Sequence, residues 1–175
     1  MKLTKYSDIP KFPFSSYSVD VSLDYVLFNL SSFMEQGEVE LNPEFQRGHV
    51  WSPEQQTAYM EFRMRGGMSG KDIYFNHPSW QGGYKKGDKL VCVDGLQRLS
   101  AAVAFLFGQI PVFGSYIYEY EERLRMAGQL NFFTFHIANL KTDKEIMEWY
   151  LSLNEGGTPH SESEINRVKE MVESA

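Results

Sequence analysis

The sequence predicts an α+β domain that is built on a small mixed sheet with flanking helices. Segments with helical periodicity and segments with strand-like alternation are mixed along the 175 residues, and long irregular loops separate them. No internal repeat, low-complexity stretch or Pro/Gly/Ser-rich linker divides the chain, so we expect a single domain over residues 1–175. Hydrophobic residues make up 42% and charged residues 23% of the sequence, which are ordinary values for a globular protein.

Start and stop signals place two helices in the first part of the chain. Ser22 is in position to cap a helix that runs to about residue 36, and Gly37 would end it. Ser52 followed by Pro53 predicts a second helix start, because proline favours the first helical position. This helix is expected to run to about residue 65.

Capping-box spacings mark two helices in the second part of the chain. Thr142 with Glu145 predicts a helix to about residue 153, and Ser161 with Glu164 predicts one to about residue 173. Between these pairs of helices, periodicity predicts a helix over 96–107 and a continuous or broken helix over 116–128.

Alternating or continuously apolar runs predict the strands. They are expected over residues 38–41, 71–76, 89–94 and 130–140, with a short extended piece at 110–114. In the last of the four strands, Phe133, Phe135 and Ile137 share one face, which should point into the core.

Charge and cysteine usage limit the classes of function. The net charge of -6 and the pI near 5.2 weigh against DNA binding through a broad basic face, although they leave room for a local basic groove. Cys92 is the only cysteine, so an internal disulfide and a multi-cysteine metal site are excluded, and a buried packing role is expected for it. The longest apolar runs are far shorter than a membrane span and the N-terminus lacks a signal-peptide core, so we expect a cytoplasmic protein without a membrane partner.

The first stretch with candidate functional residues is "NPEFQRGHVW", residues 42–51. It has no regular period, and Phe45 and Trp51 would anchor it to the core. Gln46 and Arg47 lie between these anchors. The stretch is therefore either an anchored surface loop or a support that holds an amide and a guanidinium over a pocket.

The second stretch is "VDGLQR", where a buried strand meets a helix. The start of a helix presents free backbone N–H groups and a positive dipole end, which together favour a bound phosphate. Arg98, one turn into the helix, could add a bidentate contact. Asp94 could hold Mg²⁺ or cap the helix, and its spacing alone favours capping.

The third stretch is "LNEGGTPHSESEI", residues 153–165. Asn154 ends one helix, and the two glycines that follow permit left-handed backbone or the close approach of a ligand. A plain connector between two helices explains the same pattern. The four histidines, at positions 49, 77, 136 and 160, have no metal-binding spacing.

Together, these three stretches resemble the ParB/sulfiredoxin-like domain found at the N-terminus of GmrSD-type restriction enzymes. The family marks are a proline-aromatic-Gln-Arg loop with a later tryptophan, an Asp-Gly-Gln-Gln-Arg motif, and a Leu-Asn-x-Gly-Gly/Thr segment. They correspond here to "PEFQRGHVW", "DGLQR" and "LNEGGTPHSESEI", and the resemblance covers about residues 22–170.

The resemblance implies a domain with the ParB/sulfiredoxin-like fold that binds a nucleoside triphosphate and can hydrolyse it. The implied catalytic residues are Asp94, Gln97 and Arg98, with Asp94 holding Mg²⁺. The residues implied to bind the nucleotide are Gln46, Arg47, Gly95, Arg98 and Asn154.

Two departures from the family pattern shape the expected function. Leu96 replaces the first glutamine of the central motif, which removes a polar contact and points to weak hydrolysis. These 175 residues also contain no nuclease histidine-metal motif, so restriction activity is not expected of this chain by itself. A stand-alone domain of this kind resembles small versions in phage genomes, and a role in phage defence is also implied. Two alternatives stay open: a ParB-like protein that binds or nicks DNA, and a non-catalytic protein that inhibits a host or phage partner.

Overall fold

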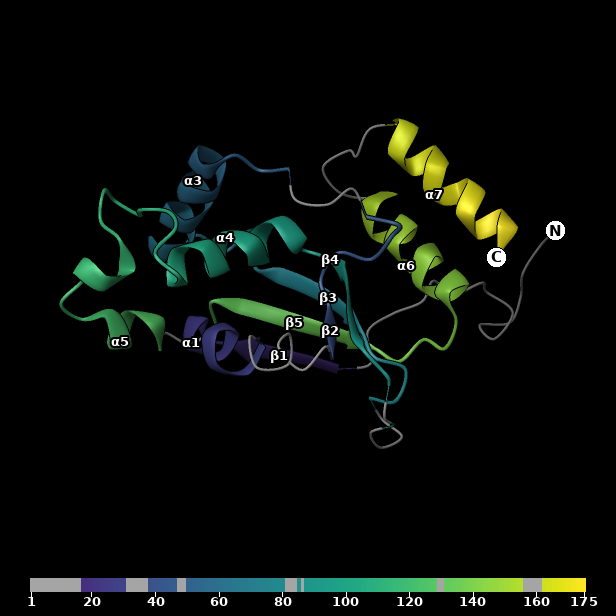
Figure 1. Ribbon diagram of the computed structural model, residues 1–175, viewed down its shortest axis with the longest axis horizontal. Coiled ribbons are helices and arrows are strands. Elements are labelled where there is room, and N and C mark those ends of the chain that lie inside the picture. Colours follow the sequence, from purple (N-terminus) through teal and green to yellow (C-terminus); the bar gives the residue numbers. More distant parts are fainter. Residues whose placement is uncertain are drawn as a thin grey trace, which may run out of the picture.

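In the computed structural model, five strands form one open mixed sheet in the order β1-β5-β3-β4-β2 (Figure 1). The strands are β1 (Tyr17–Val21), β2 (Val39–Glu40), β3 (Asp72–Asn76), β4 (Leu90–Asp94) and β5 (Phe133–Ala138). The α-helices are α1 (Leu23–Tyr25), α3 (Pro53–Met64), α4 (Leu96–Leu106), α5 (Arg123–Ala127), α6 (Asp143–Glu155) and α7 (Glu162–Ser174). The structure describes residues 17–30, 38–46, 50–80, 85, 87–128, 131–155 and 162–175.

Parallel and antiparallel pairings alternate across the sheet. β1 pairs with β5 antiparallel, β5 with β3 parallel, β3 with β4 antiparallel, and β4 with β2 parallel. The predicted α+β class with a mixed sheet is therefore confirmed.

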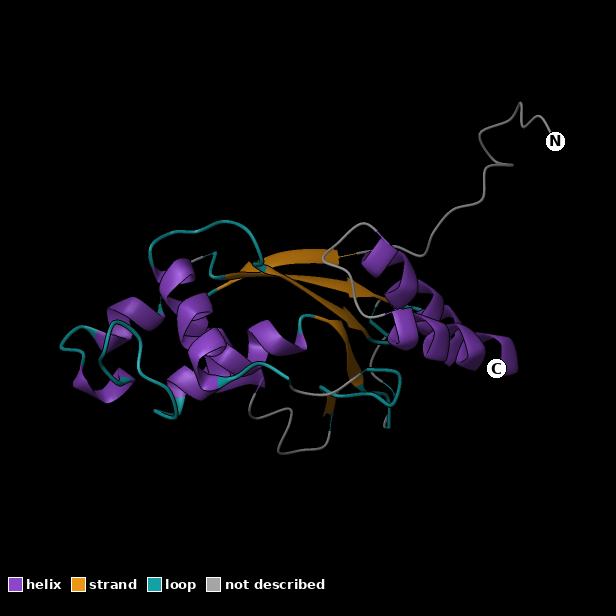
Figure 2. Cartoon of the chain, turned by 90° about the horizontal axis from the view of Figure 1, so that it is seen from above, coloured by secondary structure: helices purple, strands orange, loops and turns teal. Residues whose placement is uncertain are grey.

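The helices pack on the sheet in two groups, which Figure 2 shows toward its two ends. The larger core joins α1, α3 and α4 to one face of the sheet, where Phe133, Phe135 and Ile137 are at most 3% exposed, as their alternation predicts. A smaller core joins α6 and α7 to Val93 on β4 and Ala138 on β5, the two strands that flank β3. No helix in the described parts of the chain is long and apolar enough to cross a membrane.

Local capping signals predicted two helix starts correctly. The Ser52 hydroxyl accepts a hydrogen bond from the Gln55 N–H, and the Gln55 amide oxygen accepts one from the Ser52 N–H. Thr142 and Glu145 make the same reciprocal pair at the start of α6. The cap predicted at Ser161 lies outside the described residues, although α7 begins at the next residue.

Other local predictions differ from the structure. After α1, the chain takes a π-helical turn over Val26–Leu30, and the rest of the helix predicted to residue 36 lies outside the described residues. Ser22 occupies the N-cap position, but its hydroxyl donates to the Asp24 carboxylate and makes no cap hydrogen bond. The competing carboxylate two residues away explains why this cap fails.

The segment predicted as a helix over 116–128 takes the broken form. It contains a 3₁₀ turn over Ile117–Glu119 and the five residues of α5. Between them, the Tyr120 hydroxyl donates to the Val112 carbonyl at 2.5 Å and its ring packs edge-on against Phe105. These tertiary contacts of Tyr120 hold the chain extended at the point where a continuous helix would have to pass.

Candidate functional site

The joint between β4 and α4 depends on Gly95. Its backbone is left-handed, with φ at 109°, and a Cβ at this position would lie 2.6 Å from Ile73 Cδ1 and 3.2 Å from Ile73 Cα. Glycine therefore meets two separate requirements here, one conformational and one steric. Gly95 is also the N-cap of α4, and it provides no side-chain acceptor for the first N–H groups of the helix.

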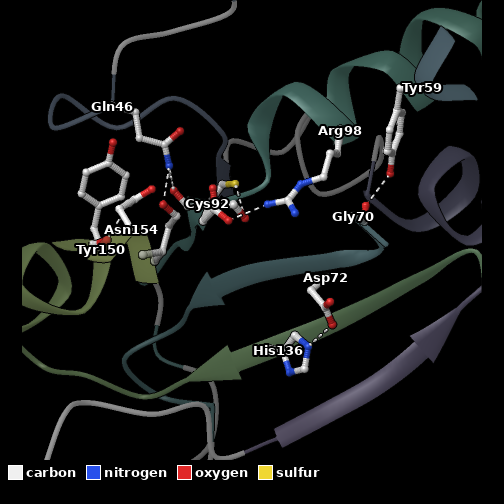
Figure 3. Close-up of polar contacts among 11 residues, drawn as sticks. Gln46, Tyr59, Gly70, Asp72, Cys92, Arg98, His136, Tyr150 and Asn154 are labelled. Atoms are coloured by element: carbon white, nitrogen blue, oxygen red, sulfur yellow. Dashed lines mark hydrogen bonds and ion pairs between the residues drawn. The ribbon is translucent and has the colours of Figure 1, made fainter. Parts of the chain in front are cut away.

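Asp94 pairs with Arg98 and does not cap α4, so the capping role that its spacing favoured is wrong. The Arg98 guanidinium lies 2.5 Å from the Asp94 carboxylate (Figure 3), and the two side chains are 21% and 30% exposed. Capping fails because the left-handed Gly95 takes the cap position and Arg98, one turn along, offers Asp94 a charged partner.

An irregularity in the strand pairing affects the position of Asp94. The register between β3 and β4 shifts at Tyr74 and Phe75, so that Tyr74 lies opposite Asp94 while Phe75 lies opposite Cys92. Burial raises the pKa of Tyr74, and the nearby carboxylates of Asp72 and Asp94 raise it further, so this phenol stays neutral. Bulges of this kind often re-aim a side chain beside a site.

The turn before β3 supports the Arg98 side chain. The Tyr59 hydroxyl donates to the Gly70 carbonyl at 2.8 Å (Figure 3), and a methyl group added to Gly70 would lie 3.7 Å from Arg98 Cδ. Burial raises the pKa of Tyr59 far above its usual value, so this hydroxyl remains a hydrogen-bond donor at all physiological pH values. The Arg98 side chain is 21% exposed, and its charged end reaches Asp94.

The first motif is fastened to this joint from both ends. The Gln46 amide nitrogen donates to the Cys92 and Val93 carbonyls at 2.6 and 2.9 Å. On the other side, the Gln97 amide oxygen accepts hydrogen bonds from the N–H groups of Val50 and Trp51 at 2.9 and 3.0 Å. The loop is therefore tied to β4 on one side and to α4 on the other.

The predicted anchors of this loop lie in the two cores. Phe45 is 8% exposed within the smaller core, and Trp51 packs against the larger core and the Tyr59 ring. Arg47, which the first motif places between these anchors, lies outside the described residues together with Gly48 and His49.

The third motif reaches the same place through α6. Phe45 packs against Tyr150 with ring centroids 5.4 Å apart, and the Asn154 amide donates to the Tyr150 carbonyl at 2.6 Å. Figure 3 draws Asn154 and Tyr150 on α6 together with Gln46, whose amide reaches β4. The glycine pair that follows Asn154 lies outside the described residues.

The structure describes six of the seven residues that the sequence proposed for the site, and it gathers all of them except Asn154 at the β4–α4 joint. The six residues are Gln46, Asp94, Gly95, Gln97, Arg98 and Asn154. A surface pocket of about 430 Å³ lies elsewhere, between α3 and the segment around α5, and is lined by none of these six residues. Its lining residues include Met64, Phe113 and Tyr120.

The joint offers little to a metal ion by itself. Within the described parts of the chain, no group of three His, Cys, Asp or Glu side chains could hold one. Asp94 is a single carboxylate that already contacts a guanidinium. Cys92 lies on β4, two residues before Asp94, and it is fully buried. Burial is the main cause that raises the pKa of its thiol to about 12. Both observations agree with the packing role predicted for it.

Two features near the predicted site were missed by the sequence reasoning. The Arg167 guanidinium on α7 donates to the Glu44 and Phe45 carbonyls at 3.1 and 2.8 Å, which adds a third support to the first loop. On the sheet, His136 contacts Ser18 and Asp72. These contacts join residues that are 64 to 123 positions apart in the sequence, so no local sequence pattern could predict them.

Comparison with known proteins identified no relative of this chain. No family model matches the chain, and no curated protein or solved structure is significantly similar to it.

Proposed function

We propose that this chain is a nucleotide-binding domain of the ParB/sulfiredoxin-like type that holds the phosphates of a nucleoside triphosphate at the β4–α4 joint. The observation that carries the proposal is the Asp94–Arg98 pair on the first turn of α4, whose N-cap is a glycine. A helix start of this kind favours an anion, and a guanidinium beside it can bind phosphate oxygens in pairs.

The exposure of this pair supports an exchange of partners. Arg98 and Asp94 are partly exposed, and ion pairs of this kind contribute about 1 kcal/mol or less to stability. A phosphate can therefore take over Arg98 at small cost to the fold.

In this proposal, the two glutamines position the first loop. The Gln46 amide binds backbone carbonyls of β4, and the Gln97 amide binds the N–H groups of Val50 and Trp51. Arg47 would then supply a second cation to the phosphates. Asn154 would close the site from the side of α6.

Mg²⁺ fits this site only together with the nucleotide. The ion is commonly held by one or two carboxylates, phosphate oxygens and water, and Asp94 could be its protein ligand. Leu96 is 8% exposed and packs in the larger core, so its side chain offers nothing to an attacking water. We therefore propose binding as the main activity, with slow hydrolysis.

Thermal unfolding with nucleotides tests the proposal. A ligand that binds only the folded state stabilises it by about 2.7 kcal/mol at a concentration of 100 times Kd. ATP, GTP, CTP and UTP, each with Mg²⁺, should include at least one that stabilises the protein, and Arg98→Gln should remove the effect. Arg125→Gln is the matched control, because Arg125 also pairs with an acid on its own helix turn but lies at α5.

Two results would contradict nucleotide binding at this joint. One is the absence of stabilisation by any of the four nucleotides. The other is equal stabilisation of the Arg98→Gln and Arg125→Gln variants, which would place the ligand elsewhere.

A substitution of Asp94 separates its two proposed roles. Without Mg²⁺, Asp94→Asn should bind the nucleotide more tightly, because Arg98 loses its competing anion. With Mg²⁺, the same variant should bind more weakly if the carboxylate holds the ion. Titration calorimetry with and without the metal measures both effects, and equal changes under the two conditions would remove Mg²⁺ from the proposal.

A further inference from the structure

Ser18, His136 and Asp72 form a hydrogen-bonded chain across three neighbouring strands. The Ser18 hydroxyl lies 2.8 Å from His136 Nδ1, and the Asp72 carboxylate lies 2.7 Å from His136 Nε2. Figure 3 shows the second of these contacts on the sheet, apart from the Asp94–Arg98 pair. Strand register explains the meeting, because Ser18 on β1 lies directly opposite His136 on β5.

The chemistry of the partners fixes the direction of the hydrogen bonds. A carboxylate only accepts hydrogen bonds, so Nε2 of the neutral ring carries the proton that is shared with Asp72. Nδ1 then has a free lone pair and accepts from the Ser18 hydroxyl. His136 is therefore held in the tautomer that can take a proton from this serine.

The imidazole ring is also held by packing. It stacks on the Tyr74 ring with centroids 4.7 Å apart and an angle of 16° between the planes, and Tyr74 in turn meets the edge of Trp149. Hydrogen bonds at both nitrogens and an aromatic ring against one face leave His136 little freedom to turn. Such preorganisation is what a general base requires.

In the hydrogen-bonded series Ser18–His136–Asp72, the serine end is open to solvent. Ser18 is exposed, and the side chains of His136 and Asp72 are 20% and 40% exposed. Beside them, the Lys71 ammonium lies 3.6 Å from the Asp20 carboxylate, which also accepts a hydrogen bond from Thr134. This ion pair thus involves the residue two positions from Ser18 on β1.

We propose that Ser18 is the nucleophile of an acyl-transfer site, with His136 as general base and Asp72 as the group that orients it. A nucleophile within hydrogen-bond reach of a base, itself oriented by a third group, is the arrangement that activates serine on unrelated folds. The ring nitrogens are used in the opposite order to the best-known serine proteases, but either nitrogen is basic when the other carries the proton. This site is independent of the proposed nucleotide site.

The reaction needs no added cofactor. Ser18 Oγ attacks the carbonyl carbon of an ester, its proton passes to His136 Nδ1, and Asp72 stabilises the imidazolium. The C–O bond to the leaving alcohol breaks, and the alcohol departs with the proton from His136. Water then attacks the acyl-serine by the same route, which releases the acid and restores the Ser18 hydroxyl.

The surroundings of Ser18 define the substrate class. Ser18 stands on an edge strand of the sheet, where its neighbours Tyr17 and Asp20 are also exposed, so we expect a substrate that does not depend on an enclosed pocket. Small esters with a good leaving group fit these conditions.

Acylation by p-nitrophenyl acetate tests the proposal on the full chain. The expected result is a burst of p-nitrophenol and an acetyl group on the peptide that contains Ser18, located by mass spectrometry. Ser18→Ala should abolish this burst, and His136→Gln should slow it by roughly 100-fold, as expected for loss of a general base. Ser174→Ala is the matched control, because Ser174 is an exposed serine that bonds only its own helix in the contacts described here.

Two outcomes of these measurements would overturn the proposal. Acetyl groups found only on lysines or the N-terminus would show that Ser18 is not activated. An equal rate of Ser18 acetylation in wild type and His136→Gln would show that the histidine takes no part. Asp72→Asn should give a rate reduced at least about 10-fold with an unchanged melting curve, since a purely structural role would alter the melting curve instead.

Discussion

Arg63 in the last turn of α3 and Arg98 in the first turn of α4 are both held by hydrogen bonds, but their partners differ in kind. Arg63 is 5% exposed, and its guanidinium donates to the carbonyls of Gly67, Asn131 and Phe132 while it lies 5.2 Å from the centre of the Phe132 ring. Arg98 has a carboxylate partner and keeps a fifth of its side chain exposed.

This difference separates a structural arginine from one that is available to a ligand. Backbone carbonyls are fixed in the fold and cannot leave Arg63, so no anion can replace them. The Asp94 carboxylate belongs to a partly exposed side chain, and a phosphate can take its place. Burial of the charge alone therefore does not indicate a site, and the partner of the charge is the more informative observation.

The largest effect is expected from removal of Arg63. Arg63→Met should lower the free energy of unfolding by about 3–5 kcal/mol, because it leaves the buried Phe132 carbonyl and the partly buried carbonyls of Gly67 and Asn131 without this donor. Urea denaturation measures this change. Arg65→Met, two residues away and exposed over the Phe113 ring, should cost less than about 1 kcal/mol. Equal losses in the two variants would mean that the contacts of Arg63 do not hold the fold.

A smaller loss is expected at the glycine that shapes the Arg98 region. Gly95→Ala should cost about 2–4 kcal/mol, since it combines left-handed backbone with a Cβ only 2.6 Å from Ile73 Cδ1. Gly114→Ala isolates the backbone contribution, because its φ is 77° and nothing lies within 4 Å of an added Cβ. That control should lose about 1 kcal/mol in the same denaturation measurement. If both variants lose the same amount, contact with Ile73 is unimportant.

The smallest effect on stability is expected from the Asp94–Arg98 pair itself. A double-mutant cycle with Asp94→Asn and Arg98→Gln should give a coupling energy of about 0.5–1 kcal/mol, as for other partly exposed ion pairs. Chemical denaturation of the four proteins gives this value. A coupling above about 3 kcal/mol would make Arg98 a structural residue like Arg63, and the exchange proposed for it would then be too costly.

The sequence predicted those parts of the fold that depend on neighbours in the chain. Ser52 and Thr142 start helices because their partners are three residues away, and Phe133, Phe135 and Ile137 reveal their shared face by alternation. The broken segment around Tyr120 was only half predicted, because its form depends on a hydrogen bond to Val112 and on packing against Phe105.

The candidate site shows the same division. Its motifs could be found in the sequence, and the anchoring by Phe45 and Trp51 follows from their hydrophobicity. The role of Asp94 could not, because the choice between capping and pairing depends on the left-handed geometry of Gly95. Strand register alone assembles Ser18, His136 and Asp72, and register cannot be read from one sequence.

The position of β5 has a consequence for how the chain folds. β5 lies between β1 and β3 in the sheet, although it is the last of the strands along the sequence. During synthesis, β1 and β3 therefore remain without β5, the strand that pairs with both of them, until residue 138 has emerged. Pairings of such high sequence separation form slowly, and unpaired strand edges promote aggregation. The yield of folded protein should therefore depend on whether the edges of β1 and β3 are protected from other chains before β5 has been synthesised.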